Sequence, residues 1–125
     1  MLKCFQAYYC FTGIKHCEKF LSTLNYKDAT TTFPEDMVQA AVITLFRVGK
    51  FYAKIFTPIA EDQVRFTQEA IKSYQSVVDY CRHHPHHLKH VTSEHSQCLN
   101  TVDMLQRQLH MHARATQDQD DTEQS

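Results

Sequence analysis

Six of the nine histidines in this chain of 125 residues lie in one short stretch, CRHHPHHLKHVTSEH at residues 81–95. Histidine is the commonest metal ligand in proteins, so the first chemistry that this stretch suggests is a zinc or copper site. If a helix begins near residue 87, then His87, His90 and Glu94 share one of its faces, because side chains three and four residues apart are neighbours on a helix. Two imidazoles and a carboxylate in that arrangement could hold a metal ion.

The order of these residues argues against a dedicated metal site. Neither zinc signature of a helix, H-E-x-x-H or H-x-x-E-H, occurs in the chain. Pro85 divides the stretch, so that His83 and His84 end one helix, where a positive charge suits the helix dipole. His95 falls among apolar positions, which predicts a core or interface histidine with a hydrogen-bond partner. The sequence therefore favours a polar, solvated connection between two helices, and we expect no metal ligand and no cofactor.

Thiols are the other reactive side chains, at Cys4, Cys10, Cys17, Cys81 and Cys98. Their odd number and the absence of a C-x-x-C pair are typical of reduced cysteines in the cytosol rather than of a disulfide framework. His95 and Cys98 could pair as base and nucleophile, but Cys98 falls on an apolar stripe, whereas an activated thiol needs an exposed, electropositive setting. The sequence also lacks a glycine-rich phosphate loop and a nucleophile elbow. We therefore predict no catalytic residue and no enzyme.

The composition is that of an ordinary water-soluble domain, with 42% hydrophobic residues, 22% charged residues and a formal net charge of -1. This balance gives no basic excess for nucleic acid and no long apolar run for membrane insertion, and no motif suggests a small-molecule substrate. Two glycines and three prolines leave little room for a turn-rich β fold. We expect a helical, cytoplasmic protein.

Apolar side chains recur at helical spacing in four segments, which predicts α-helices near residues 3–25, 35–56, 61–84 and 87–113. Pro34 suits the start of the second helix, and the residues before Pro58 and Pro85 end the second and third. Because the connections are short, successive helices are expected to be antiparallel neighbours, which gives an all-α fold of two helical hairpins. A closed four-helix bundle and the end of a longer α-solenoid both fit this spacing. Residues 116–125 contain no apolar side chain and are predicted to form a disordered acidic tail behind a helical segment, 1–115.

Several segments of the predicted helices resemble the C-terminal region of the KIF-binding protein family (kinesin-binding proteins). The matching segments are KHCEKFLSTL at residues 15–24, Phe33-Pro34-Glu35, LFRVGKFYAKI at residues 45–55 and SYQSVVDYCRHHP at residues 73–85. The resemblance covers roughly residues 14–85 and continues weakly to residue 113. Ala40 departs from the pattern, since it stands where the family has proline, and the first dozen residues match poorly.

The resemblance implies a non-enzymatic regulator that binds kinesin motor domains, keeps them from microtubules, and so affects axonal transport, outgrowth and neurogenesis at the cytoskeleton. It also implies a tetratricopeptide-like (TPR-like) α-solenoid, of which this chain looks like the last two hairpins, as a fragment. A preceding repeat would then stack on the first helix, which predicts an exposed apolar patch of Phe5, Tyr8, Tyr9 and Phe11. The alternatives are a helical-bundle scaffold or adaptor for another protein, and a metal- or thiol-dependent protein.

Four acids off the apolar stripes are the candidate partner-binding residues: Glu61, Asp62, Glu69 and Asp79. A motor that engages an acidic track must present a basic face, and opposing acids on an inhibitor would favour binding to it. The alternative interpretation is a solvated helix face. Glu61 and Asp62 also suit the N-terminus of the third helix, where acids stabilise the dipole without any partner.

Overall fold

The computed structural model describes the backbone of residues 2–124 and the side chains of residues 6–112. Four α-helices follow one another along the chain: α1 (Leu2–Thr23), α2 (Val38–Lys54), α3 (Ala60–His83) and α4 (Thr92–Gln124). Two short 3-10 helices stand between them, η1 (Glu35–Met37) before α2 and η2 (Pro85–His90) before α4. The described residues contain no β-strand, and the predicted all-α class is confirmed.

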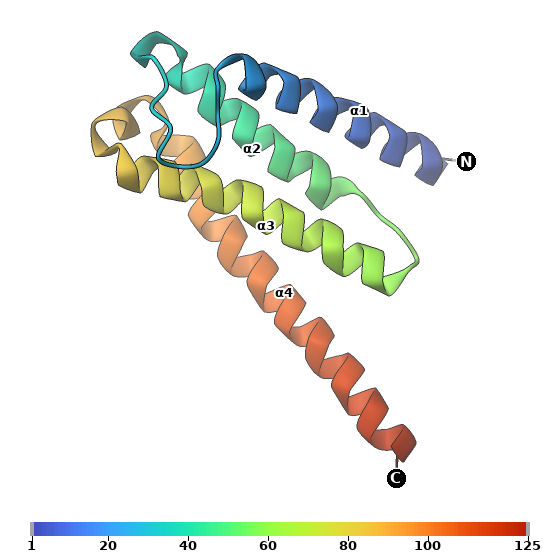
Figure 1. Ribbon diagram of the computed structural model, residues 1–125. Helices are drawn as coiled ribbons and strands as arrows, with labels where there is room; N and C mark the ends of the chain where they lie inside the picture. The colour runs from blue at the N-terminus through green and yellow to red at the C-terminus, as the bar shows by residue number, and fades with distance from the viewer. Residues whose placement is uncertain (1, 125) are drawn as a thin grey trace.

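The helices pack in chain order, each antiparallel to the one before it (Figure 1). Helix α1 packs on α2, α2 on α3 and α3 on α4, while α1 and α4 lie at opposite edges of the array. A closed four-helix bundle would bring the first and last helices together, so this arrangement is the open, solenoid-like alternative. The predicted antiparallel hairpins, α1–α2 and α3–α4, are confirmed, and the α2–α3 interface joins them.

The core lies along α2, which has a neighbouring helix on both sides. Its buried residues are Val38, Ala41, Val42, Leu45, Phe46, Val48 and Gly49. The predicted stripes of the other helices also face inward, since Ile14 of α1, Val78 of α3 and Val102 of α4 are each less than a tenth exposed. Burial of one such side chain stabilises the fold by about 1.5–3 kcal/mol, so these stripes determine which helices pack together.

Both glycines of the chain lie at close contacts between helices. A Cβ atom on Gly49 of α2 would lie 2.7 Å from the ring of Tyr74 on α3. A Cβ atom on Gly13 of α1 would lie 2.5 Å from the ring of Phe51 on α2. Because both distances are shorter than an ordinary Cβ contact, each glycine lets an aromatic ring rest directly against the backbone of a neighbouring helix, and a side chain there would require the ring to move.

Two predicted helix bounds at the C-terminal end of the chain are wrong. Residues 85–90 form the 3-10 helix η2, so α4 begins at Thr92 and not near residue 87. Helix α4 then continues to Gln124, past the predicted end near residue 113 and through residues predicted to be disordered. No glycine or proline follows Pro85, and the glutamines and glutamate near the chain end are good helix formers. Ser125 lies outside the described residues, and the division of the chain at residue 115 stays a prediction.

The connection between α1 and α2 is long, and it crosses one face of the array toward α3 (Figure 1). It begins at Asn25, whose φ of 57° is in the left-handed region that asparagine tolerates. The N–H groups of Asn25 and Tyr26 donate to the carbonyls of Ser22 and Leu21, which satisfies two free carbonyls at the end of α1. This cap turns the chain away from the axis of α1 and places Tyr26 over the array.

Candidate partner-binding groove

A groove runs between α1 and α3, with α2 as its floor. Its volume is about 440 Å³, and side chains from all three helices line it, among them Glu18 of α1, Tyr52 of α2 and Glu69 of α3. It continues into a second hollow of about 400 Å³ beside the α1–α2 connection, because Tyr26 and Lys27 line both. We call the two hollows together the α1–α3 groove.

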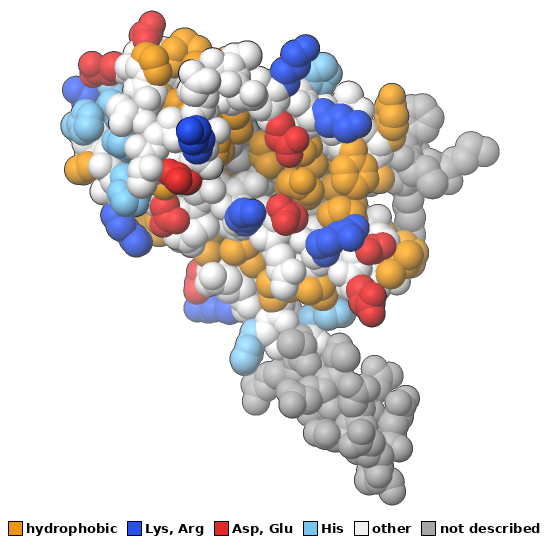
Figure 2. All heavy atoms as spheres, in the orientation of Figure 1, with side chains coloured by type: hydrophobic (Ala, Val, Ile, Leu, Met, Phe, Trp, Pro, Cys, Tyr) orange, Lys and Arg blue, Asp and Glu red, His pale blue; other side chains and the backbone are white. Residues whose placement is uncertain are grey.

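Carboxylates outnumber lysines along the α1–α3 groove. The acids that line it are Glu18, Asp28, Glu69 and Asp79, and the lysines are Lys27 and Lys72. Burial raises the pKa of the Tyr52 hydroxyl, and the negative charges of the nearby Glu18 and Glu69 raise that pKa further. The groove is therefore a concave surface with an excess of negative charge, although acidic and basic side chains are interspersed over the face of the molecule shown in Figure 2.

The four acids predicted to bind a partner fall into two pairs on α3. Glu69 and Asp79 line the α1–α3 groove. Glu61 and Asp62 lie in the first turn of α3, where they suit the positive end of the helix dipole. Asp79 is half-buried and accepts a hydrogen bond from Gln75 Nε2 at 3.0 Å. The structure thus brings two of the predicted residues to one surface and keeps the other two at the helix start.

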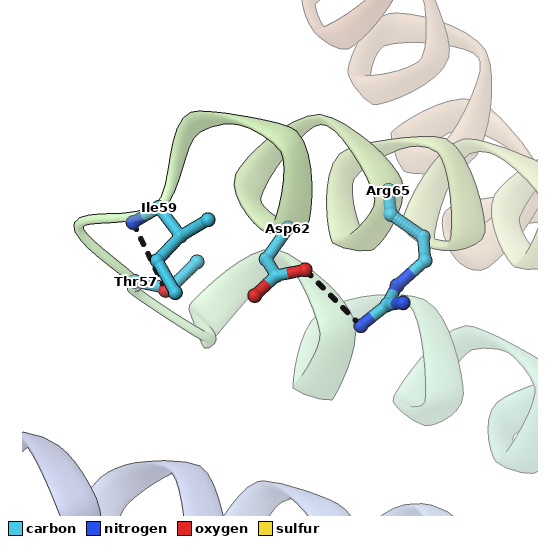
Figure 3. Close-up of polar contacts among 4 residues, drawn as sticks. All are labelled: Thr57, Ile59, Asp62 and Arg65. Carbon is cyan, nitrogen blue, oxygen red and sulfur yellow. Dashed lines mark hydrogen bonds and ion pairs between the residues drawn. The ribbon is translucent and has the colours of Figure 1, made fainter.

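Asp62 has an internal partner close by. Its Oδ1 lies 3.5 Å from a terminal nitrogen of Arg65, one helical turn later, and the two side chains point toward one another (Figure 3). In the preceding turn, the N–H of Ile59 donates to Thr57 Oγ1 at 3.3 Å. Because Arg65 compensates the charge of Asp62, Glu69 and Asp79 are better placed than Asp62 to meet a cation.

The three residues considered as metal ligands are not brought together. His87 lies in η2 with its Nδ1 2.9 Å from the hydroxyl of Tyr80. His90 Nε2 lies 3.5 Å from Glu35 Oε1, and Glu94 belongs to the first turn of α4. Since α4 begins after η2, no single helix face holds all three residues. Within the part of the chain that the structure describes, no three side chains of metal-binding type converge.

The interpretation of the histidine stretch as a solvated connection is wrong for two of its members. His84 is 8% exposed and His87 is 4% exposed, whereas His83 and His86 are exposed. Both buried rings pack around Tyr80, which has no exposed surface: the ring centroid of His84 lies 4.4 Å and that of His87 5.9 Å from the Tyr80 centroid.

This cluster continues a buried stripe of α3 past Pro85. The residues of that stripe are Val77, Tyr80, His84 and His87, spaced by three, four and three. Helical spacing could have revealed the stripe in the sequence. The proline and the polar character of histidine concealed it.

The thiols are packing groups. Cys98 of α4 has no exposed surface, and burial raises the pKa of its thiol to about 12, with Cys81 and Glu94 raising it further. Burial also raises the pKa values of Cys10 and Cys17 in α1. A thiol of this kind is protonated at neutral pH and is a poor nucleophile. The side chain of Cys4 lies outside the described residues.

Apolar side chains are exposed at the start of α1 and near the α2–α3 connection. Tyr8 is 72%, Tyr9 68% and Phe11 40% exposed, which confirms three members of the predicted patch. The side chain of Phe5 lies outside the described residues. Phe56 and Ile59, which were not predicted, are 56% and 57% exposed. We call these five residues the aromatic end of the molecule.

None of the helices, as far as the structure describes them, combines the length and apolar character needed to cross a bilayer.

Comparison with known proteins gives one consistent answer. The family model described as "KIF-1 binding protein C terminal" matches residues 6–111. The KIF-binding protein of Gallus gallus is 31% identical over 86 residues, which cover 66% of this chain and 14% of that protein. The KIF-binding protein of Xenopus tropicalis is 30% identical over 87 residues, with the same shares. That of Homo sapiens is 31% identical over 78 residues, or 59% of this chain and 12% of the relative.

This chain therefore spans only about 14% of the length of the first two relatives. No solved structure matches it. The family model extends from within α1 into α4, so it covers the three helices that line the α1–α3 groove and the part of α4 that packs on α3. By this match, the chain belongs to the KIF-binding protein family and corresponds to its C-terminal region.

Proposed function

We propose that this chain binds kinesin motor domains and contributes part of the surface that keeps a bound motor away from microtubules. The observation that carries the proposal is the family match over residues 6–111, to relatives whose name states that they bind a KIF. The activity is binding without catalysis. In a cell it would act in the cytoplasm at the cytoskeleton and so affect axonal transport, outgrowth and neurogenesis.

The α1–α3 groove is the surface that best fits this task. A motor that engages an acidic track presents a basic face, and the groove offers four carboxylates against two lysines. Opposite charge raises the rate of encounter and suppresses wrong partners, more than it raises affinity by itself. Glu69 and Asp79 are the predicted acids that line the groove. Glu61 and Asp62 lie outside the groove lining, on the first turn of α3, and would extend the acidic surface there.

Removal of the four charges tests the proposal. We expect the combined variant Glu61→Gln, Asp62→Asn, Glu69→Gln and Asp79→Asn to weaken binding to a kinesin motor domain by about tenfold. That factor corresponds to about 1.4 kcal/mol in binding free energy, or a few tenths of a kcal/mol for each exposed ion pair that an acid would form with the motor. Because a small part of an extended interface rarely retains full affinity, the measurement uses a chimera in which this chain replaces the matched segment of the Gallus gallus relative. Binding is titrated at several salt concentrations, and the slope against salt should fall in the variant.

The control is Asp103→Asn on α4. Asp103 is an exposed acid that pairs with Arg107 at 3.1 Å and lies away from the groove. This variant should leave both affinity and salt slope unchanged. If the combined variant also leaves both unchanged while helicity is retained, the acids serve solvation only and the motor contact lies elsewhere.

A scaffold or adaptor for another protein is the second candidate, and the aromatic end favours it. Tyr8, Tyr9 and Phe11 expose a row of rings on α1, as a helical array does where a further hairpin stacks on it. Under this alternative, Tyr8→Ser with Tyr9→Ser would abolish association with the partner, whereas the variant without the four acids would retain it.

A further inference from the structure

One buried hydroxyl joins three segments of the chain. Tyr80 of α3 has no exposed surface, and its oxygen accepts a hydrogen bond from the N–H of Phe33 at 3.3 Å. The same oxygen lies 2.9 Å from Nδ1 of His87 in η2. The Phe33 ring stacks on the Tyr80 ring, with centroids 5.0 Å apart. Tyr80 thereby fastens both the α1–α2 connection and η2 to α3.

The direction of the Tyr80–His87 hydrogen bond depends on the protonation of His87. Burial raises the pKa of Tyr80, so the hydroxyl keeps its proton near neutral pH and can donate it to an unprotonated Nδ1. When the imidazole is protonated, both of its nitrogens become donors. The Tyr80 oxygen would then receive two N–H groups, from Phe33 and from His87, and its own proton would lose its acceptor. A buried donor without an acceptor is costly, so protonation weakens the junction.

The surroundings of His87 include other histidines and one acid. The pKa of His87 lies below its ordinary value of 6.5 because the ring is buried, and because His86 and His84 lie beside it. Glu35 of η1 acts in the opposite direction, and His90 again lowers that pKa. Among the described residues, α2 and α4 add no charged group to those that act on His87.

We propose that the Tyr80–His87 contact is a pH-sensitive latch that holds the α1–α2 connection against α3 and opens on acidification. Tyr26 and Lys27 of that connection line the α1–α3 groove. The Tyr26 ring also stacks on Phe33, with centroids 5.7 Å apart, and Phe33 donates to the latch. Release of Phe33 therefore moves one wall of the groove while the helices stay in place. The proposal of a latch depends on these contacts alone and does not require that the groove binds a motor.

The direction of the pH effect follows from linkage. A histidine whose pKa is lower in the folded state binds fewer protons there than in the unfolded chain. The stability that it contributes is complete above its ordinary value of 6.5 and is lost as the pH falls from there through the folded pKa. An ion pair between His90 and Glu35 offsets little of this loss, because the two side chains are 35% and 68% exposed.

The test is an NMR titration of the whole chain from pH 8 to pH 5. We expect the His87 ring to titrate below pH 6.5, and the amide of Phe33 and the ring of Tyr26 to shift with the same midpoint. In His87→Asn, an amide oxygen replaces Nδ1 as a non-titrating acceptor, so the coupled shift should disappear and the Phe33 amide should stay protected at pH 5. His86→Asn, at an exposed neighbour, is the matched control: it should keep the coupled shift, with one midpoint for His87, Phe33 and Tyr26 that moves upward because one of the groups that lower the His87 pKa is removed.

Three results would overturn the latch. One is a Phe33 amide that moves with a midpoint different from that of His87. Another is a coupled shift that persists in His87→Asn. The third is a Tyr26 ring that does not respond while Phe33 does, because the groove wall would then be independent of the junction. Tyr80→Phe serves as a second variant: it removes the hydroxyl and should abolish the shift at every pH.

Discussion

The two ends of this helical array use aromatic side chains in opposite ways. At the histidine end, where η1, η2 and the α1–α2 connection meet, Phe33 and Tyr80 are no more than 1% exposed and their polar groups are paired. At the aromatic end, Tyr8 and Tyr9 are 68–72% exposed. The same class of residue is therefore buried in the core at one end and exposed on the surface at the other. Composition alone does not distinguish these uses, whereas burial and hydrogen bonding do.

The largest expected effect separates the two ends directly. Replacing a buried aromatic residue by alanine costs about 3–5 kcal/mol, so Tyr80→Ala should lower the free energy of unfolding by about that amount. Tyr8→Ala should change it by no more than about 0.5 kcal/mol, because the ring is 72% exposed. Urea unfolding followed by circular dichroism measures both. Equal losses in the two variants would mean that Tyr8 is covered, for example by a second copy, and would remove the contrast.

A smaller effect is expected at the two glycines, where an aromatic ring rests against the backbone of a neighbouring helix. In Gly49→Ala, the new methyl would meet the ring of Tyr74, which is only 4% exposed and has little room to move. The overpacking should cost about 1–3 kcal/mol, more than the gain of about 0.5–1 kcal/mol in helix propensity. In Gly13→Ala, the methyl meets the tip of the half-buried Phe51 ring, which can swing away.

We therefore expect Gly13→Ala to be close to neutral and Gly49→Ala to be destabilising, measured as thermal midpoints under one set of conditions. The opposite order would show that α1 is held more rigidly against α2 than α2 is against α3. The aromatic end would then be the firmer part of the molecule.

The sequence predicted only part of this difference in burial between the aromatic residues of the two ends. Helical spacing predicted the four helices and the buried faces of α1, α2 and α3, because apolar side chains three and four residues apart must share a face. It missed Tyr80, His84 and His87, because Pro85 and the polar character of histidine concealed the helical spacing that these residues share with Val77. The contact of Tyr80 with Phe33, 47 residues earlier, has no local signal. The exposure of Tyr8 and Tyr9 follows from the resemblance to a longer solenoid, because a preceding repeat would stack on α1 at these positions.

The candidate partner surface was predictable only in part. Sequence identified Glu69 and Asp79 as acids outside the core, but it could not show that Glu18 and Asp28 complete the same groove from α1 and the α1–α2 connection. Tertiary packing decides which helices flank a groove. The spacing of apolar residues allowed both a closed four-helix bundle and the open array that the structure shows. The four carboxylates come together only through the tertiary packing of α1, the α1–α2 connection and α3.

The smallest expected effect is that of a chelator, which should leave the thermal midpoint unchanged. His87 Nδ1 is engaged with Tyr80, and His90 lies beside Glu35, so the histidine end is held by the protein's own side chains. A structural zinc ion contributes directly to folding free energy, and its removal would lower the midpoint by many degrees. The measurement compares melting curves with and without chelator, then after addition of stoichiometric zinc, at pH 7.5. A midpoint that falls with chelator and recovers with zinc would mean that the rings around Tyr80 rearrange about a metal. The contrast between the two ends would then rest on an ion and not on packing.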